Sequence, residues 1–463
     1  MTARPTAKLP KVAAPFLGQM HDLFEPDEIW EAGRRLGVIT RDRKIDLPAL
    51  VEGTVLALSG LPGTQTSAFA NYIQLAGHSL APSAFYDRFT GPFAKLMGDL
   101  ARRAVKGVRA VDPGSVREEQ FARLLERFTD VRITDSTCMV LQRLAESWAP
   151  STSKVRPAGF KLHAVVSAVD LLPVEQHLSP QRRHDNPELD ESALEAGTLF
   201  IPDLGYVDDR RTIRLLDRGV QTLMRLKKNQ NPIIHRVHLG KADKVACRGK
   251  RLDDAFTAGL LDFSSGFVDL DVELAAQIDG KTERRIVRVV GVEDRAGGPY
   301  ADCWFYLTTV PRDVLSASEV AVTYSVRWEI ELLWKHLKTG VALSSLRAWR
   351  QESVAALVHA KIVALCLARL LELSLQKQAK LHAYGQLAIV LVLSRLAPSI
   401  MAARMLARGL TLEDMEERLL LSASIIARSR NQRRERAKRK RFATLAAEEQ
   451  PIRSTENVCN MHA

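Results

Sequence analysis

The sequence predicts a mixed α/β protein with helical regions at both ends. Apolar residues recur at helical spacing up to about residue 128, and glycines separate the segments. From about residue 129, short runs with strand-like alternation lie between shorter helical segments, which is typical of an α/β core. With 463 residues, the chain is long enough for two or three domains.

The composition favours a polyanionic partner. Lys and Arg number 66 against 54 Asp and Glu, which gives a formal charge of +12. Nucleic acid is the first candidate, although an ordinary basic enzyme fits the charge equally well. The five cysteines form no C-x-x-C pair, so we expect neither a zinc site nor a disulfide framework, and a reducing cytoplasm fits.

We expect no export signal and no membrane partner. The N-terminus has no apolar stretch of secretory length. The most apolar region, residues 354–375, contains His359, Lys361, Arg369 and Glu372, whose charges would be costly in a bilayer. It is therefore interpreted as a buried helix.

Residues 1–128 are expected to form a helical domain that binds DNA. The helical segments are 51–58, 66–74, 82–89 and 92–105. A helix-turn-helix with residues 83–88 near the start of its later helix is one interpretation. Packing of three helices without any DNA contact is the other, and the sequence leaves both open.

Residues 129–246 are expected to form the first part of a catalytic core, and residues 247–310 a β-rich insertion. The core strands are predicted to begin at Val131 and to include 161–169, 199–202 and 221–226, with helices at 192–196 and 208–217. The strongest strand runs of the insertion are 267–274, 285–292 and 303–308.

Residues 311–345 are expected to return to the core with a helix that begins near Val322. A helical region, 346–428, follows it, and residues 429–463 form a basic and flexible tail. Eight of the thirteen residues from 429 to 441 are Lys or Arg. A solvated tail and an electrostatic contact with DNA phosphates both fit this composition.

The segment from Tyr324 to Lys338 places four polar residues on one stripe of a helix. At about 100° per residue, Arg327 and Glu331 share this stripe with Tyr324 and Lys338, whereas Glu329 falls elsewhere. The opposite face carries the apolar residues Val326, Ile330, Leu333 and Leu337. An ordinary amphipathic helix with an ion pair between Glu331 and Lys335 is the alternative.

Two upstream strand-like runs each end in an aspartate, VRIT in Asp135 and LFIP in Asp203. Either residue could simply cap a helix or open a turn. Together with Glu331, however, they could bring three carboxylates into one cleft, where such oxygens hold Mg²⁺ ions for phosphoryl transfer. Arg327 and Lys338 would then contact phosphates, and Tyr324 would supply a hydroxyl.

These residues resemble those of bacterial insertion-sequence transposases with a DDE triad, often called the IS-four family. Tyr324, Arg327, Glu331 and Lys338 match the full Y-x2-R-x3-E-x6-K signature, and Asp135 in TDST and Asp203 in PDLGY support it. The resemblance extends from about residue 129 to 345.

The resemblance implies an RNase H-like core with a β-rich insertion, in which Asp135, Asp203 and Glu331 bind two Mg²⁺ ions that Mn²⁺ could replace. The enzyme would cut DNA at transposon-end inverted repeats and join the ends to target DNA, as a homodimer in the bacterial cytoplasm, associated with the nucleoid. Some relatives cut through a DNA hairpin, with a flipped base on a tryptophan of the insertion. Trp304 is the candidate here, Trp328 competes with it, and a buried core tryptophan is the alternative.

Two other functions stay open at this point. An RNase H-like nuclease without strand transfer would use the same carboxylates and metal ions. A catalytically inactive DNA-binding regulator would keep the acidic residues only as surface or capping groups. Lys161 and His163 in GFKLH resemble a family strand segment, although a neutral histidine on a strand is usually structural.

Overall fold

The computed structural model describes most of the chain between residues 13 and 423. The described ranges are 13–41, 45–59, 64–78, 80–110, 126–168, 172–227, 229–293, 303–335, 337–338, 343, 346–379 and 386–423. The basic tail at 429–463 lies outside the described residues.

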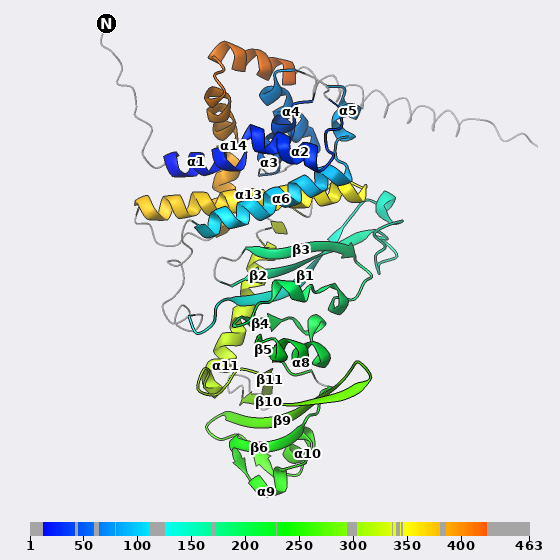
Figure 1. The fold of residues 1–463 in the computed structure, drawn as a ribbon, viewed down its shortest axis with the longest axis vertical. Helices are drawn as coiled ribbons and strands as arrows, with labels where there is room; N and C mark the ends of the chain where they lie inside the picture. The colour runs from blue at the N-terminus through cyan, green and yellow to red at the C-terminus, as the bar shows by residue number, and fades with distance from the viewer. Residues whose placement is uncertain are drawn as a thin grey trace, which may run out of the picture.

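A helical layer forms one end of the molecule (Figure 1). Its N-terminal members are α1 (Ala13–Leu23), α2 (Pro26–Arg35), α3 (Leu47–Leu58), α4 (Gln65–Ala76), α5 (Pro82–Tyr86) and α6 (Gly91–Ala110). Every residue of α3 is buried, which explains why its apolar residues show no single face. The long C-terminal helix α13 (Gln351–Ala379) packs on α3 and α6, so the two ends of the chain share one core.

The strands form one nine-stranded sheet in the order β3-β2-β1-β4-β5-β11-β10-β9-β6. Their bounds are β1 (Val131–Val140), β2 (Gly159–Ser167), β3 (Pro173–Pro180), β4 (Leu199–Pro202), β5 (Gln221–Arg225), β6 (Ile233–Leu239), β9 (Phe267–Ile278), β10 (Lys281–Glu293) and β11 (Cys303–Thr308). Strands β1, β4 and β5 are parallel to one another, whereas the remaining neighbours pair antiparallel.

The strands of the β-rich segment continue the core sheet. Strand β11 pairs with β5, and β6, which precedes residue 247, pairs with β9 (Figure 1). Helix α8 (Asp209–Asp217) packs on β5 and β9. The short elements α9 (Lys244–Cys247), α10 (Leu252–Thr257), β7 (Lys241–Ala242) and β8 (Leu261–Asp262) lie at the far end from the helical layer.

Three local expectations need correction. Strand β1 does not break after Asp135, because residues up to Val140 stay paired with β2. The helix expected at 192–196 is a single 3₁₀ turn, Glu191–Ala193, whose start is capped by Asp190. The helix expected to begin near Val322 begins earlier, as α11 (Ala317–Tyr324), because Ser316 and Glu319 form a capping box there.

The segment from Tyr324 to Lys338 is not one continuous α-helix. A 3₁₀ turn, Ser325–Arg327, separates α11 from α12 (Trp328–Lys335), and residues 337 and 338 adopt π-helical geometry. The expected apolar face nevertheless packs inward, and its buried residues are Val326, Ile330, Leu333 and Leu337. The core therefore fixes which side of this segment faces the sheet.

One helix, Gln351–Leu371, is long and apolar enough to span a membrane by length and composition alone. Within the described residues, 89% of its most apolar window is buried inside the protein, as in the core helix of a globular domain. Helix α14 (Gln386–Ala407) follows α13 and packs against it.

A buried charge cluster ties the two ends of the chain together. Glu52 on α3 is completely buried, and its carboxylate accepts hydrogen bonds from Arg404 at 2.6 Å and from Arg408 at 2.8 Å. An uncompensated charge in the same place would be costly.

We therefore expect Glu52→Ala to lower the free energy of unfolding by about 3 to 5 kcal/mol, because it leaves two arginines without their carboxylate. Urea unfolding would measure this change. The matched control is Glu31→Ala on an exposed face of α2, which should change stability by less than about 0.5 kcal/mol. Equal effects of the two substitutions would contradict the role of Glu52.

Candidate active site

Parallel strands β1 and β4 bring Asp135 and Asp203 together. Thr134 lies opposite Pro202 in the strand register, and the Asp203 amide donates a hydrogen bond to the Thr134 carbonyl at 3.0 Å. Asp203 follows the last residue of β4, where its own carboxylate accepts from the Gly205 amide at 3.2 Å. Two aspartates from distant parts of the sequence thus lie on neighbouring strands.

Helix α12 and the turn before it add the third acidic residue. The Trp334 indole donates to the Asp135 carboxylate at 3.1 Å, which anchors α12 to β1. The Arg327 guanidinium lies 3.6 Å from an Asp203 oxygen and 3.2 Å from a Glu331 oxygen. The structure therefore gathers Asp135, Asp203 and Glu331 around Arg327 and Trp334.

The carboxylates of the site lie close together, which favours the binding of a positive charge beside them. Burial, and then the negative charge of Asp203, raise the pKa of the Asp135 carboxyl to about 6. Hydrogen bonds from the Ser136 amide and the Trp334 indole act in the opposite direction. A cation close to these carboxylates would favour their ionised forms.

The other signature residues lie on both sides of this cluster. The Tyr324 ring packs against the Tyr306 ring at 5.0 Å between centroids, and burial raises the pKa of Tyr324. Lys338 lies just beyond α12 and is partly exposed. Arg327 is only 14% exposed because its guanidinium is engaged by the carboxylates.

Trp304 is partly exposed on β11, and the Arg225 guanidinium lies 3.7 Å from its ring centroid. Arg225 pairs across the sheet with Tyr306, the residue that contacts Tyr324. Aromatic and basic side chains therefore extend from Tyr324 to Trp304. Trp328 is 60% exposed, and the Arg327 guanidinium lies 5.6 Å from its ring centroid.

A polar network beside the carboxylates joins Lys161 and His163 to residues that the sequence did not single out. Asp185 accepts hydrogen bonds from the Ser136 hydroxyl at 3.0 Å and from the Lys161 ammonium at 2.9 Å. His163 is hydrogen-bonded to the Tyr206 hydroxyl at 2.6 Å and to Ser179 at 2.7 Å. Asp185 lies in an irregular segment without a pattern, and Tyr206 ends a 3₁₀ turn in the PDLGY motif, of which only Asp203 was singled out from the sequence.

The network fixes the strands that carry the aspartates. His163, His177 and Glu188 lie close enough to hold a metal ion, but both ring nitrogens of His163 are already hydrogen-bonded. Tyr206 belongs to the turn that Asp203 opens. These contacts therefore indicate a structural role, in which His163 and Tyr206 hold the turn after β4 against β2.

The comparisons identify the family. Residues 126–367, more than half of the chain, match the sequence profile of the transposase DDE domain family. The chain therefore belongs to this family of transposases, and it is a DNA transposase.

Its relatives are transposases of insertion sequences. The chain is 20% identical over 386 residues to the transposase of IS231D from Bacillus thuringiensis subsp. finitimus, which covers 76% of this chain and 78% of the relative. It is 38% identical over 81 residues to the putative transposase InsL of IS186A from Escherichia coli K12, or 18% of this chain and 21% of the relative. A structure of the piggyBac transposase synaptic complex with hairpin DNA aligns with a TM-score of 0.41 at 11% identity, over 91% of this chain and 87% of the other.

The His163 network predicts a pH dependence of stability. Burial, and then the positive charge of His177, lower the pKa of His163 from 6.5 to about 4. The unfolded chain therefore takes up a proton at a higher pH than the folded one. Stability from this residue is complete above about pH 6.5, falls with decreasing pH, and is lost by about pH 4, a total of about 3 kcal/mol.

Urea unfolding at several pH values would measure this slope. His163→Gln should make this slope shallower between pH 6.5 and 4, but not flat, because burial also lowers the pKa of His359 to about 4. The control His184→Gln, at an exposed position, should keep the natural slope. If the free energy of unfolding of the His163→Gln variant changed with pH as steeply as that of the natural chain, another group would cause the acid sensitivity.

Proposed function

We propose that Asp135, Asp203 and Glu331 hold two Mg²⁺ ions, which Mn²⁺ could replace, and that this centre cuts transposon ends and joins them to target DNA. The observation that carries the proposal is the convergence of three carboxylates around Arg327 and Trp334. Their oxygen ligands are those that Mg²⁺ prefers. The raised pKa of Asp135 also fits a site that accepts a cation.

The sheet topology supports an RNase H-like core. Its first five strands lie in the order β3-β2-β1-β4-β5, with β1 to β3 antiparallel and β1, β4 and β5 parallel. Asp135 lies on the central strand of this group, and Asp203 follows its parallel neighbour. This arrangement places both aspartates at the junction of the antiparallel and parallel halves.

The side chains of this site would have different roles in phosphoryl transfer. When bound, two divalent ions supply activation of the attacking oxygen and stabilisation of the leaving oxygen. Trp334 and the Ser136 amide orient the Asp135 carboxylate. Arg327 is placed to exchange a carboxylate contact for a DNA phosphate, and Lys338 supplies a second cation beyond the same helix.

The signature spacing supports membership of the IS-four group of insertion-sequence transposases. Tyr324, Arg327 and Glu331 meet at one site although a 3₁₀ turn interrupts their helix. Terminal inverted repeats and target DNA would be the substrates, and a dimer on DNA would cut the two ends together. The enzyme would act in the bacterial cytoplasm, at the nucleoid.

Trp304 is the residue proposed to stack on an unpaired base at the cleavage point. Its ring is already in contact with a flat cation, Arg225, at 3.7 Å, and it is partly exposed. A base could occupy the same kind of stacking contact. The buried-core alternative is less consistent with this exposure.

The triad assignment predicts that Asp135→Asn, Asp203→Asn and Glu331→Gln each lower DNA cleavage about a thousandfold or more, because a metal ligand is lost. Binding to terminal-repeat DNA should persist. The measurement is Mg²⁺-dependent cleavage and strand transfer on DNA that carries the inverted repeats. Glu329→Gln, two residues away on the same helix, is the control and should stay active.

The products also separate the competing functions. Joined products from the natural chain but none from Glu331→Gln would support a transposase with Glu331 in its active centre. Cleavage without joining would favour a nuclease. Binding without cleavage by the natural chain would favour an inactive regulator.

The base-stacking assignment predicts that Trp304→Ala slows end cleavage by about tenfold or more, because stacking contributes about 1 to 3 kcal/mol per base. Trp304→Phe should keep most of the rate, since it keeps an aromatic face. Single-turnover cleavage of terminal-repeat DNA would measure both. A larger loss in Trp328→Ala than in Trp304→Ala would move the assignment to Trp328.

A further inference from the structure

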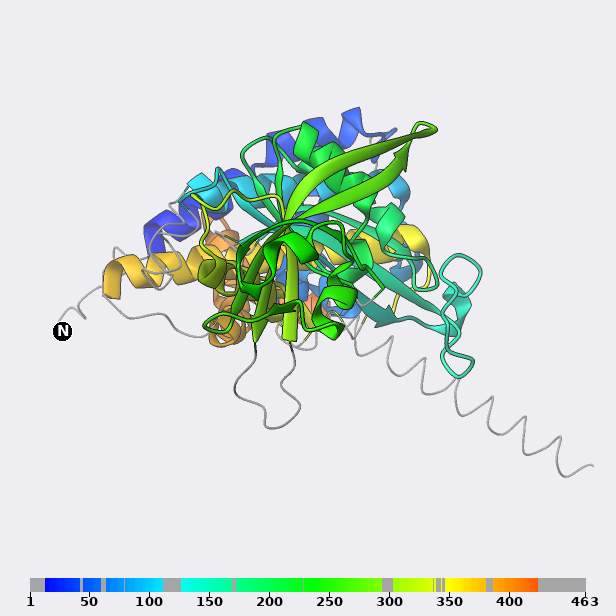
Figure 2. The ribbon, with the colours of Figure 1, turned by 90° about the horizontal axis from the view of Figure 1, so that it is seen from below.

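A second basic surface lies outside the carboxylate cluster. It is formed by the loop after β1, residues 141–158, together with residues 346–350 just before α13, and we call it the basic groove. Two cavities open along it, one of about 380 Å³ beside residues 346–350 and one of about 530 Å³ along the loop. Figures 1 and 2 both show the loop on the same side of the molecule as the start of α13.

Hydrogen bonds hold the two halves of the basic groove together. The Gln142 side-chain amide donates to the Arg347 carbonyl at 2.8 Å. The Trp148 indole donates to the Trp349 carbonyl at 2.7 Å. The groove therefore has a defined shape, and it connects the catalytic strand β1 to the segment that follows the signature helix.

The charge of the basic groove is strongly one-sided. Lys154, Arg156 and Arg347 are exposed and form no ion pair with another described residue. Arg143 is 86% exposed and lies at 3.9 Å from its acidic neighbour Glu146, too far for a tight pair. Such unpaired cations along a groove fit a chain of phosphates.

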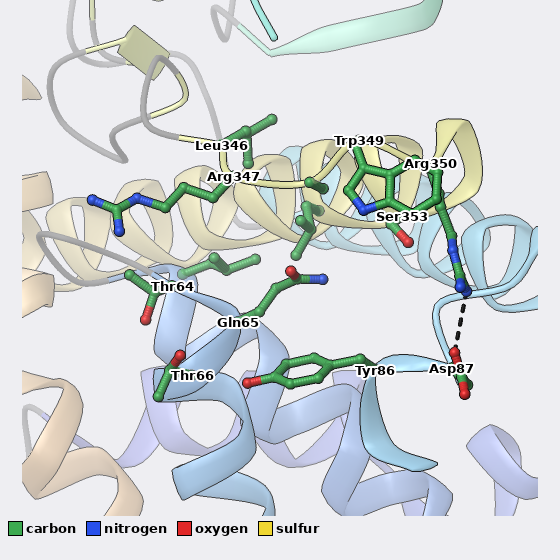
Figure 3. A pocket seen from close by; sticks show the side chains of 13 residues that line it. Thr64, Gln65, Thr66, Tyr86, Asp87, Leu346, Arg347, Trp349, Arg350 and Ser353 are labelled. Atoms are coloured by element: carbon green, nitrogen blue, oxygen red, sulfur yellow. Dashed lines mark hydrogen bonds and ion pairs between the residues drawn. The ribbon is translucent and has the colours of Figure 1, made fainter. Parts of the chain in front are cut away.

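The cavity beside residues 346–350 adds groups that suit a nucleic acid backbone. Figure 3 shows Arg347 and Arg350 at opposite ends of this cavity, with Gln65 and Tyr86 between them on the side of α4 and α5. Trp349 is 44% exposed, and the Arg350 guanidinium, which also pairs with Asp87, lies 5.3 Å from its ring centroid. Arginine, amide and hydroxyl donors are those that contact DNA phosphates and sugars.

The position of the basic groove relates it to the DNA that is cut. Strand β1 continues for five residues beyond Asp135 and ends at Val140, which lines the larger cavity. Five residues of strand span about 17 Å. A duplex rises about 3.4 Å per base pair, so the groove would begin about five base pairs from a phosphate that reacts beside Asp135.

We propose that the basic groove binds the sugar-phosphate backbone of the duplex that is being cut, about five base pairs from the reacting phosphate. The proposal rests on the transposase function, and its distance of about five base pairs also rests on the proposed placement of the reacting phosphate beside Asp135. Phosphate contacts fix the position of a duplex without reading its sequence. The groove would therefore hold the DNA in register with the active site, while sequence is read elsewhere.

The test compares two triple substitutions that remove the same charge. One changes the groove residues, Lys154→Gln, Arg156→Gln and Arg347→Gln. The control changes exposed cations around α9 at the opposite end of the sheet, Lys244→Gln, Arg248→Gln and Lys250→Gln (Figure 1). Fluorescence anisotropy of the full chain with a labelled terminal-repeat duplex, at several salt concentrations and without divalent ions, measures binding independently of catalysis.

We expect the groove variant to bind the duplex about tenfold more weakly. The plot of log affinity against log salt concentration should also become less steep, by about two to three in its slope, because about three phosphate contacts are lost. The control variant should change little in either quantity. Equal changes in both variants would overturn the proposal, because only net charge would then matter. An unchanged affinity and slope in the groove variant would also overturn it. If that variant bound end DNA normally but failed to join pre-cut ends to a target plasmid, the groove would hold target DNA instead.

Discussion

The site depends on the parallel pairing of β1 with β4. The hydrogen bond from the Asp203 amide to the Thr134 carbonyl fixes the register in which two aspartates lie side by side. A shift of one residue would turn the side chains of β4 to the opposite face of the sheet. The tight turn after β4, held by the contact between Tyr206 and His163, protects this register.

Bringing carboxylates together has an electrostatic cost that the surrounding structure offsets. Asp135 is largely buried, and the nearby Asp203 charge opposes its ionisation. Arg327 supplies a positive charge between Asp203 and Glu331, and Trp334 supplies a donor to Asp135. The helical layer uses the same solution for Glu52, whose buried charge is balanced by two arginines. In both places arginine side chains balance the charge of carboxylates.

The sheet is continuous, so strand β11 of the β-rich segment lies near the signature residues. Strand β11 pairs with β5, which follows β4 in the sheet, and its Tyr306 packs against Tyr324 of the signature. Arg225 and Trp304 extend this surface away from the carboxylates. The loop after β1 extends it toward the helical layer. DNA bound at the three carboxylates, as proposed, would meet basic and aromatic side chains on both sides.

The sequence by itself predicted the mixed α/β class, most of the helices and strands, and the residues that meet at the site, but not β3, β6, α1 or α2. It could do so because burial imposes local periods on apolar residues, and because the signature fixes the spacing of Tyr324, Arg327 and Glu331 within one short segment. The tertiary structure alone decided that Asp135 lies inside a strand, that Arg327 bridges two carboxylates, and that Asp185 and Tyr206 support them. Those facts depend on pairing between segments far apart in the chain, which no local period records.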